Sequence, residues 1–253
     1  GLRNNIGDTY FYMHSYSIQK FNFDIDINKD FGFSIIQAFL QKVSYEPQIL
    51  IFFCALITNV LIVWTIYKYS TLIDVSIFVY ITSGIYLVTM NGIRQYLAAS
   101  ISFVATKYII QRDWKKYFLI VLLASTIHKS ALILIPAYFI VCRKAWRAQT
   151  FLILLVGIFV MIAYNQISAL IFGALEETQY GHYENFSEGG ASVLRVLVYA
   201  SPLLISFMGR KRLERINPES SDVIINMSLI GLFFMVISTQ NWIFARMAIY
   251  FNL

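Results

Sequence analysis

The sequence predicts an all-α protein, a polytopic bundle of transmembrane helices, from three observations. Of the 253 residues, 58% are hydrophobic and 13% are charged, and the mean hydropathy is +0.63. A soluble domain is typically about a quarter charged. The apolar residues form runs close to the roughly 20 residues that cross a bilayer as a helix. Lys and Arg gather in the short connections between these runs, which is typical of cytoplasmic loops. We therefore expect the lipid bilayer as a partner and no nucleic acid.

The apolar runs can be assigned in chain order to one transmembrane domain over residues 1–253. Residues 1–46 are polar and aromatic, contain no spanning run, and are expected at the outer face, with a short amphipathic helix over 33–43. We expect spans at about 49–67, 73–90 and 93–110, a short helical pair over 117–142, spans at about 150–171, 193–208 and 223–239, and a partial span at 243–253. Because the chain begins without Met and ends inside an apolar run, we expect it to be a fragment.

The segment 117–142 needs a separate explanation. Basic clusters flank it on both sides, so both of its ends are expected in the cytoplasm. Only an even number of crossings satisfies this rule, and at about 1.5 Å per residue the segment makes one generous span or two helices of about 20 Å each. We favour two short helices that meet near residues 126–129, because irregular backbone is tolerated at that depth where it lines a cavity.

This topology brings five separated polar residues to the outer half of the membrane: Arg3, Asp8, Arg94, His128 and Arg246. A charge inside a bilayer is costly unless a partner compensates it, so such residues usually have a function. Guanidinium groups bind phosphate oxygens bidentately and stay charged at low dielectric, which favours phosphate binding by the three arginines. Alternatively, each arginine extends from a helix end to the interface. Gln95, beside Arg94, either hydrogen-bonds a sugar or caps a helix.

Two residues are candidates for proton transfer. His128 lies in a strongly apolar stretch, and a neutral imidazole can take a proton from an attacking hydroxyl. Alternatively, His128 hydrogen-bonds a neighbouring helix. Asp8 is either a partner of Arg3 or a carboxylate that orients or deprotonates an acceptor. The acidic, aromatic loop 176–190, with Tyr180 and His182, is either a sugar-binding surface or a solvated connection.

Short motifs along nearly the whole chain resemble the EpsG family of bacterial membrane proteins, which are Wzy-like polymerases of exopolysaccharide and capsule. The motifs are GLRNNIGDTYFY at the start, the turn Asp30-Phe31-Gly32-Phe33, NGIRQYLAASI, IHKSAL around His128, and FARM around Arg246. The matching polar positions are Arg3, Asp8, Arg94, Gln95, His128 and Arg246. Family members often have a glutamate and a proline where this chain has Asp30 and Phe31, so no role is carried over to Asp30.

The resemblance implies an architecture similar to lipid-dependent membrane glycosyltransferases of the GT-C type, in the bacterial inner membrane. It implies a polymerase that transfers a growing glycan from undecaprenyl diphosphate onto a lipid-linked repeat unit at the outer face, with other polysaccharide-assembly membrane proteins as further partners. His128 or Asp8 would be the base, and Arg3, Arg94, Gln95, Arg246, Tyr180 and His182 would bind substrate. With arginines to neutralise the diphosphate, neither a metal nor another cofactor is predicted. The alternatives are a flippase or transporter for lipid-linked glycans, a glycan ligase and a membrane O-acyltransferase.

Overall fold

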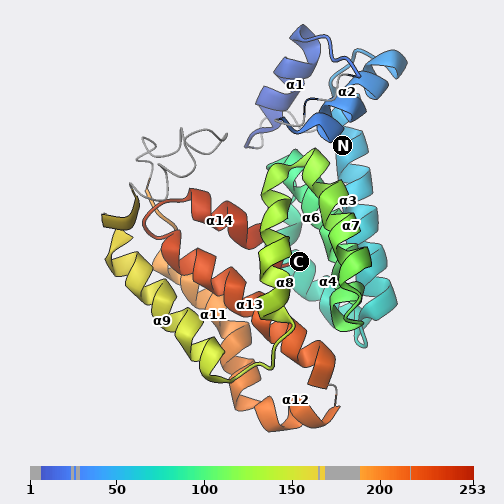
Figure 1. Cartoon of the computed structure of the whole chain (residues 1–253). Coiled ribbons are helices and arrows are strands. Elements are labelled where there is room, and N and C mark those ends of the chain that lie inside the picture. The colour runs from blue at the N-terminus through green and yellow to red at the C-terminus, as the bar shows by residue number, and fades with distance from the viewer. Residues whose placement is uncertain (1–6, 24–25, 27–28, 165, 169–188, 217) are drawn as a thin grey trace. The chain divides into compact units, whose positions relative to one another are not determined.

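A computed structural model describes residues 7–23, 26, 29–164, 166–168, 189–216 and 218–253 (Figure 1). The regular structure within these residues is helical, without a β-strand. The chain divides into two compact units, residues 1–135 with Leu253, and residues 136–252. The all-α prediction is therefore confirmed for the described part of the chain.

The first unit is built around α6. Its elements are α1 (Thr9–Ile18), α2 (Phe31–Val43), α3 (Gln48–Tyr69), α4 (Ile73–Thr82), α5 (Ile85–Val88), α6 (Ile93–Ile110), α7 (Trp114–Ile127) and η1 (Lys129–Ile133). The helix α6 packs against α3 and α7, and α2 packs against α7. The buried face of α6 includes Ala98, Ala99, Ser102 and Ala105. Such small side chains let neighbouring helix backbones approach closely, which is a common packing mode of membrane helices.

Two interruptions shape the helices of this unit. The expected span 73–90 consists of α4 and α5, because Gly84 between them has a φ of +82°, a conformation that glycine adopts without steric cost. The expected pair 117–142 is interrupted at His128, whose backbone is extended (φ −151°, ψ 114°) between α7 and η1. This interruption lies within the interval 126–129, where the sequence predicted it.

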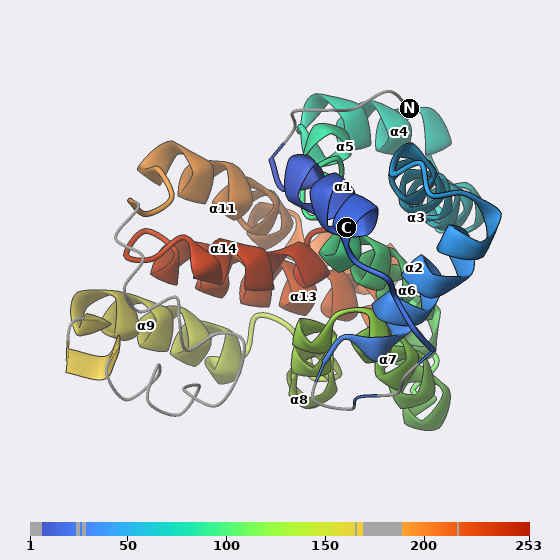
Figure 2. The same cartoon turned by 90° about the horizontal axis from the view of Figure 1, so that it is seen from above.

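The second unit is built around α13. Its elements are α8 (Leu134–Val141, which begins two residues earlier), α9 (Ala148–Ile162), α11 (Val193–Met208), α12 (Arg210–Ile216), α13 (Pro218–Ile237), α14 (Ile243–Ala248) and η3 (Ile249–Phe251). Figures 1 and 2 show α13 alongside α9 and α11. The hydrophobic core of this unit contains Leu203, Ile225, Leu229 and Leu232. The carbonyl of Arg143 accepts a 2.6 Å hydrogen bond from the Asn226 side chain, which ties the loop before α9 to α13.

Two helices of the described chain are long and apolar enough to cross a bilayer, residues Gln48–Tyr69 and Ser220–Ile237. Shorter apolar helices cover Ile73–Thr82, Lys129–Val141, Ala148–Ile162 and Val193–Met208. The boundaries of α6 and α11 coincide with the expected segments 93–110 and 193–208. Large apolar side chains on α3 are exposed, for example Phe52 at 53% and Leu56 at 50%. Such exposure is expected for a surface that lipid covers. That all these segments form one multi-pass transmembrane domain stays a prediction.

Candidate functional site around Asp30 and His128

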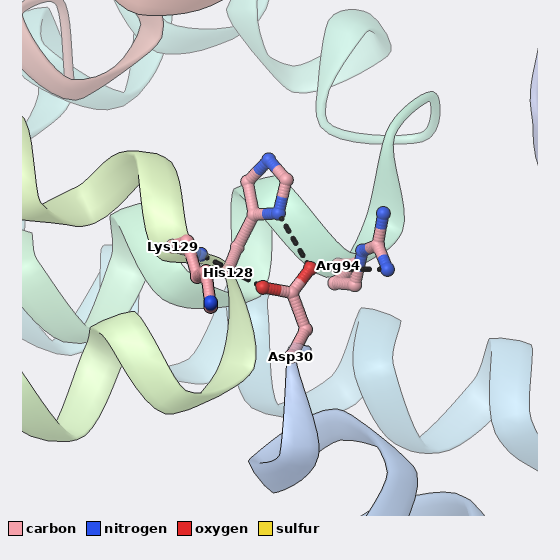
Figure 3. A network of polar contacts seen from close by, with 4 residues as sticks. All are labelled: Asp30, Arg94, His128 and Lys129. Carbon is pink, nitrogen blue, oxygen red and sulfur yellow. Dashed lines mark hydrogen bonds and ion pairs between the residues drawn. The ribbon is translucent and has the colours of Figure 1, made fainter. Parts of the chain in front are cut away.

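The first unit buries a carboxylate, Asp30, at the beginning of α2. Aspartate at this position usually caps its own helix by accepting a backbone N–H. Here the side chain makes no such hydrogen bond, and the backbone carbonyl of Asp30 accepts from the N–H groups of Phe33 and Ser34 instead. The carboxylate is only 4% exposed and is directed at residues 64 to 99 positions further along the chain (Figure 3).

Three donors from two other elements surround this carboxylate (Figure 3). Its Oδ2 lies 3.1 Å from Arg94 Nη1, in the first turn of α6, and 3.1 Å from His128 Nδ1. Its Oδ1 accepts a 2.9 Å hydrogen bond from the backbone N–H of Lys129. The network therefore joins an acid, a base and a cation that are far apart in the sequence.

Two local features of the backbone make the network possible. The interruption at His128 turns the N–H of Lys129 toward Asp30 rather than into a helical ladder. Gly32 lies against Thr126 of α7, so closely that a Cβ at position 32 would overlap the Thr126 side chain and lie 2.9 Å from its backbone carbonyl carbon. Only glycine permits this approach, which brings the start of α2 to the end of α7.

The network keeps Asp30 ionised. Burial alone would raise the pKa of the Asp30 carboxyl. The hydrogen bond with His128, the positive charge of Arg94 and the backbone N–H of Lys129 lower it by more, so the pKa lies below its usual value. The ionised carboxylate of Asp30 accepts a hydrogen bond from the Nδ1–H of His128. In the neutral imidazole the proton is therefore on Nδ1, and the free lone pair is on Nε2. Figure 3 shows this second nitrogen on the side of the ring away from Asp30.

Arg94 is placed to bind an anion as well as Asp30. Its side chain is 31% exposed, and its guanidinium carbon lies 5.9 Å from the centre of the Phe33 ring. The Nε of Arg94 is buried, and its N–H has no acceptor within the described residues. An unsatisfied buried N–H costs about 1–3 kcal/mol, and an anion that accepted from Arg94 Nε would remove this cost.

Asp8 lies beside the turn that leads into α6. The N–H of Asp8 donates to Oδ1 of Asn91 at 2.9 Å, and the same oxygen accepts from the N–H of Gly92 at 2.9 Å. Asn91 is three residues before Arg94, so the structure brings the N-terminal motif to the beginning of the helix that carries the arginine. The side chain of Asp8 does not cap α1.

The remaining predicted site residues have varied positions. Gln95 is buried on α6, at 4% exposure. Arg246 belongs to the second unit, where its guanidinium carbon lies 4.9 Å from the centre of the Trp242 ring, and its action together with Arg94 stays a prediction. Arg3, Tyr180 and His182 lie outside the described residues. Among the described residues, no group of three or more His, Cys, Asp or Glu side chains has the arrangement of a metal site.

The network has the parts of a proton-accepting site for a hydroxyl. A carboxylate that holds the imidazole through Nδ1 fixes its tautomer and stabilises the imidazolium that forms when Nε2 accepts a proton. A neighbouring guanidinium stabilises negative charge that develops on a phosphate or alkoxide. The carboxylate, the imidazole and the guanidinium therefore match a transfer reaction in which a hydroxyl loses a proton and an anion leaves.

The model of one protein family, described as the EpsG family, matches the chain over residues 1–253. The chain belongs to the EpsG family. Membership implies a polymerase-type role in polysaccharide biosynthesis with glycosyltransferase-like activity, and with the two long apolar helices it identifies a membrane protein. No curated protein and no solved structure matches this EpsG-family chain.

Asp30 is the residue of this EpsG-family site that the sequence did not reveal. The usual signal for a functional carboxylate, a charge within an apolar run, is absent, because Asp30 follows the polar stretch 24–29. Its place directly before a helix has an ordinary explanation as a cap. The signal that was available is the resemblance of the motif around Asp30 to the family, at a position where glutamate also carries a carboxylate.

Proposed function

We propose that this EpsG-family protein is a polysaccharide polymerase that joins lipid-linked glycans at the outer face of the bacterial inner membrane. The donor is a growing glycan on undecaprenyl diphosphate, and the acceptor is a lipid-linked repeat unit. The observation that carries the proposal is the buried contact between Asp30 and His128, with Arg94 on the same carboxylate oxygen.

The reaction is a substitution at the anomeric carbon of the donor. The terminal hydroxyl oxygen of the acceptor bonds to that carbon, the bond from the carbon to the diphosphate oxygen breaks, and undecaprenyl diphosphate leaves. The hydroxyl proton goes to Nε2 of His128, and Asp30 stabilises the resulting imidazolium. A positioned base of this kind contributes about 10²- to 10⁴-fold in rate.

Arg94 has the second role, the stabilisation of the leaving diphosphate. One of its terminal nitrogens already pairs with Asp30, so the guanidinium is held in place before the substrate binds. Its other N–H groups are the donors for the phosphate oxygens, and Arg246 is the expected second cation. A preorganised donor that acts on developing charge is worth about 3–4 kcal/mol of barrier.

The test replaces His128 with Ala and, separately, Arg94 with Ala in the full-length protein, at matched membrane levels. Polymer length is recorded on a gel beside the amount of accumulated lipid-linked single repeats. We expect polymer to disappear in both variants while single repeats accumulate at the outer leaflet. Normal polymer in both variants would refute the proposal, and single repeats retained at the inner leaflet would identify a flippase.

A further inference from the structure

The second unit contains a groove that the proposed polymerisation does not use. It has a volume of about 540 Å³, and its lining residues come from the end of α11, from α12 and from the beginning of α13. Figure 1 shows these three successive helices. This volume is within the range of about 300–1,000 Å³ typical of ligand pockets. Besides three serines and a glycine, the lining has six apolar residues and one cation: Pro202, Ile205, Leu213, Ile216, Ile224, Ile225 and Arg212.

The groove follows from the sequence of α11 and the residue after it. Pro202 lies inside α11 and has no N–H for the carbonyl of Val198, which accepts the Ser201 hydroxyl at 2.8 Å instead. The N–H of Gly209 donates to the carbonyl of Ile205, and α12 begins at the next residue. The change of direction between α11 and α12 leaves Ile205 and Ile216 exposed, although Leu203 and Leu213 pack in the core of the unit.

The wall of the groove is suited to a hydrocarbon chain. Ile205 is 70% exposed, Ile216 is 69% exposed and Ile224 is 59% exposed. These residues come from three successive helices and line one continuous groove. Exposed apolar surface of this kind marks an interaction site. On a membrane protein, the partner closest at hand is an acyl chain.

The charge at the same place selects an anion. Arg212 lines the groove, and α12 (RKRLERI) also contains Arg210, Lys211 and Arg215 with a single glutamate. Arg210 stacks on Phe207, with its guanidinium carbon 4.6 Å from the ring centre. The nearby carboxylate of Asp222 accepts the N–H of Ala145 at 2.9 Å. Such basic clusters beside membrane helices are typical of the cytoplasmic side and attract anionic lipid head groups.

We propose that this groove binds one anionic diacyl phospholipid of the cytoplasmic leaflet. The phosphate pairs with the guanidinium of Arg212, and one acyl chain lies along Ile205 and Ile224. The bound lipid fills the space between α11, α12 and α13 and holds these helices together. The proposed lipid binding does not depend on the glycan chemistry.

The experiment uses the purified full-length protein in detergent, titrated with phosphatidylglycerol and read by native mass spectrometry. Phosphatidylcholine, undecaprenyl phosphate and inorganic phosphate are titrated in parallel. Arg212→Gln is compared with Lys144→Gln, which removes the same charge from an exposed residue outside the lining. Ile205→Trp fills the groove, and its control is Leu204→Trp, a neighbour that is 63% exposed and does not line it.

We expect a preference for phosphatidylglycerol over phosphatidylcholine that falls about fivefold in Arg212→Gln, the effect of one basic residue near a lipid surface. Lys144→Gln and Leu204→Trp should bind as the natural protein does, Arg212→Lys should keep most of the preference, and Ile205→Trp should lose the lipid. Equal binding of both phospholipids, an equal loss in Lys144→Gln, binding of inorganic phosphate alone, or tighter binding of undecaprenyl phosphate would each overturn the proposal.

Discussion

Replacement of Asp30 by Asn tests whether the carboxylate sets the chemistry of His128. An amide has nearly the same shape as the carboxylate but offers one acceptor oxygen and two N–H donors. Oδ2 of Asp30 now accepts from both Arg94 and His128, while Oδ1 accepts from the backbone of Lys129. The single amide oxygen of asparagine cannot replace both carboxylate oxygens, so at least one of the three donors loses its acceptor.

The expected loss can be estimated from these contacts. Removal of one partner of a buried ion pair costs about 3–5 kcal/mol. Arg94 is 31% exposed and is partly solvated, so we expect Asp30→Asn to lower the free energy of unfolding by about 2–3 kcal/mol. An amide N–H directed at Nδ1 also favours the tautomer with the proton on Nε2. The base then loses its lone pair at the reacting position, and the rate falls about 10²- to 10⁴-fold.

The assay records polymer length and lipid-linked single repeats at matched membrane levels, together with a melting curve of the purified protein. Asp30→Glu should retain activity, since it keeps the carboxylate. Asp26→Asn is the matched control, because Asp26 pairs with Lys29 at 3.5 Å and its side chain is 45% exposed. Polymer of normal length in Asp30→Asn would refute the reasoning, as would an equal loss in Asp26→Asn.

Three further predictions concern the surroundings of the network. Gly32→Ala should destabilise the protein by about 1–3 kcal/mol in thermal melts and shorten the polymer, because the new Cβ would overlap Thr126. The control Gly189→Ala should be neutral, because a Cβ there meets no atom within 4 Å. Asn91→Ala removes the acceptor of two backbone N–H groups, so it should lower stability by about 1–2 kcal/mol in thermal melts and reduce polymerisation. Asn91→Asp keeps an acceptor oxygen and should restore both stability and polymerisation. Because the pKa of Asp30 is lower in the folded protein than in the unfolded chain, its stabilising contribution is complete above about pH 4 and disappears as the pH falls through the folded value. The difference in melting temperature between natural protein and Asp30→Asn should therefore shrink as the pH falls below about 4.

The sequence allowed much of the fold to be predicted, because apolar runs report helices directly. The boundaries of α6 and α11 and the interruption at His128 were expected from hydropathy and charge alone. The break at Gly84 was not expected, since a glycine within an apolar run does not by itself reveal a positive φ. The contact between Gly32 and Thr126 was also not expected, because packing between distant segments leaves no periodic signal.

The candidate site was predicted only in part, for a related reason. Arg94 and His128 were found because a charged or titratable residue is conspicuous in apolar sequence. Their common partner Asp30 lies in a polar stretch, where nothing distinguishes it from a solvated residue. From the sequence, Arg94 was expected either to bind phosphate or to extend to the membrane interface, whereas the structure pairs it with Asp30. The roles of all the predicted site residues stay predictions: Arg3, Asp8, Arg94, Gln95, His128, Tyr180, His182 and Arg246.

The most direct test of the polymerase mechanism is a reaction with the full-length protein in nanodiscs and a lipid-linked repeat unit as the substrate. Lipid diphosphate released and glycan lengthened are measured in the same sample. The mechanism predicts one lipid diphosphate for each repeat unit added, and loss of both products in His128→Ala. Glycan lengthening at an unchanged rate in His128→Ala would contradict the role of the base, and an absence of released lipid diphosphate with the natural protein would contradict glycosyl transfer itself.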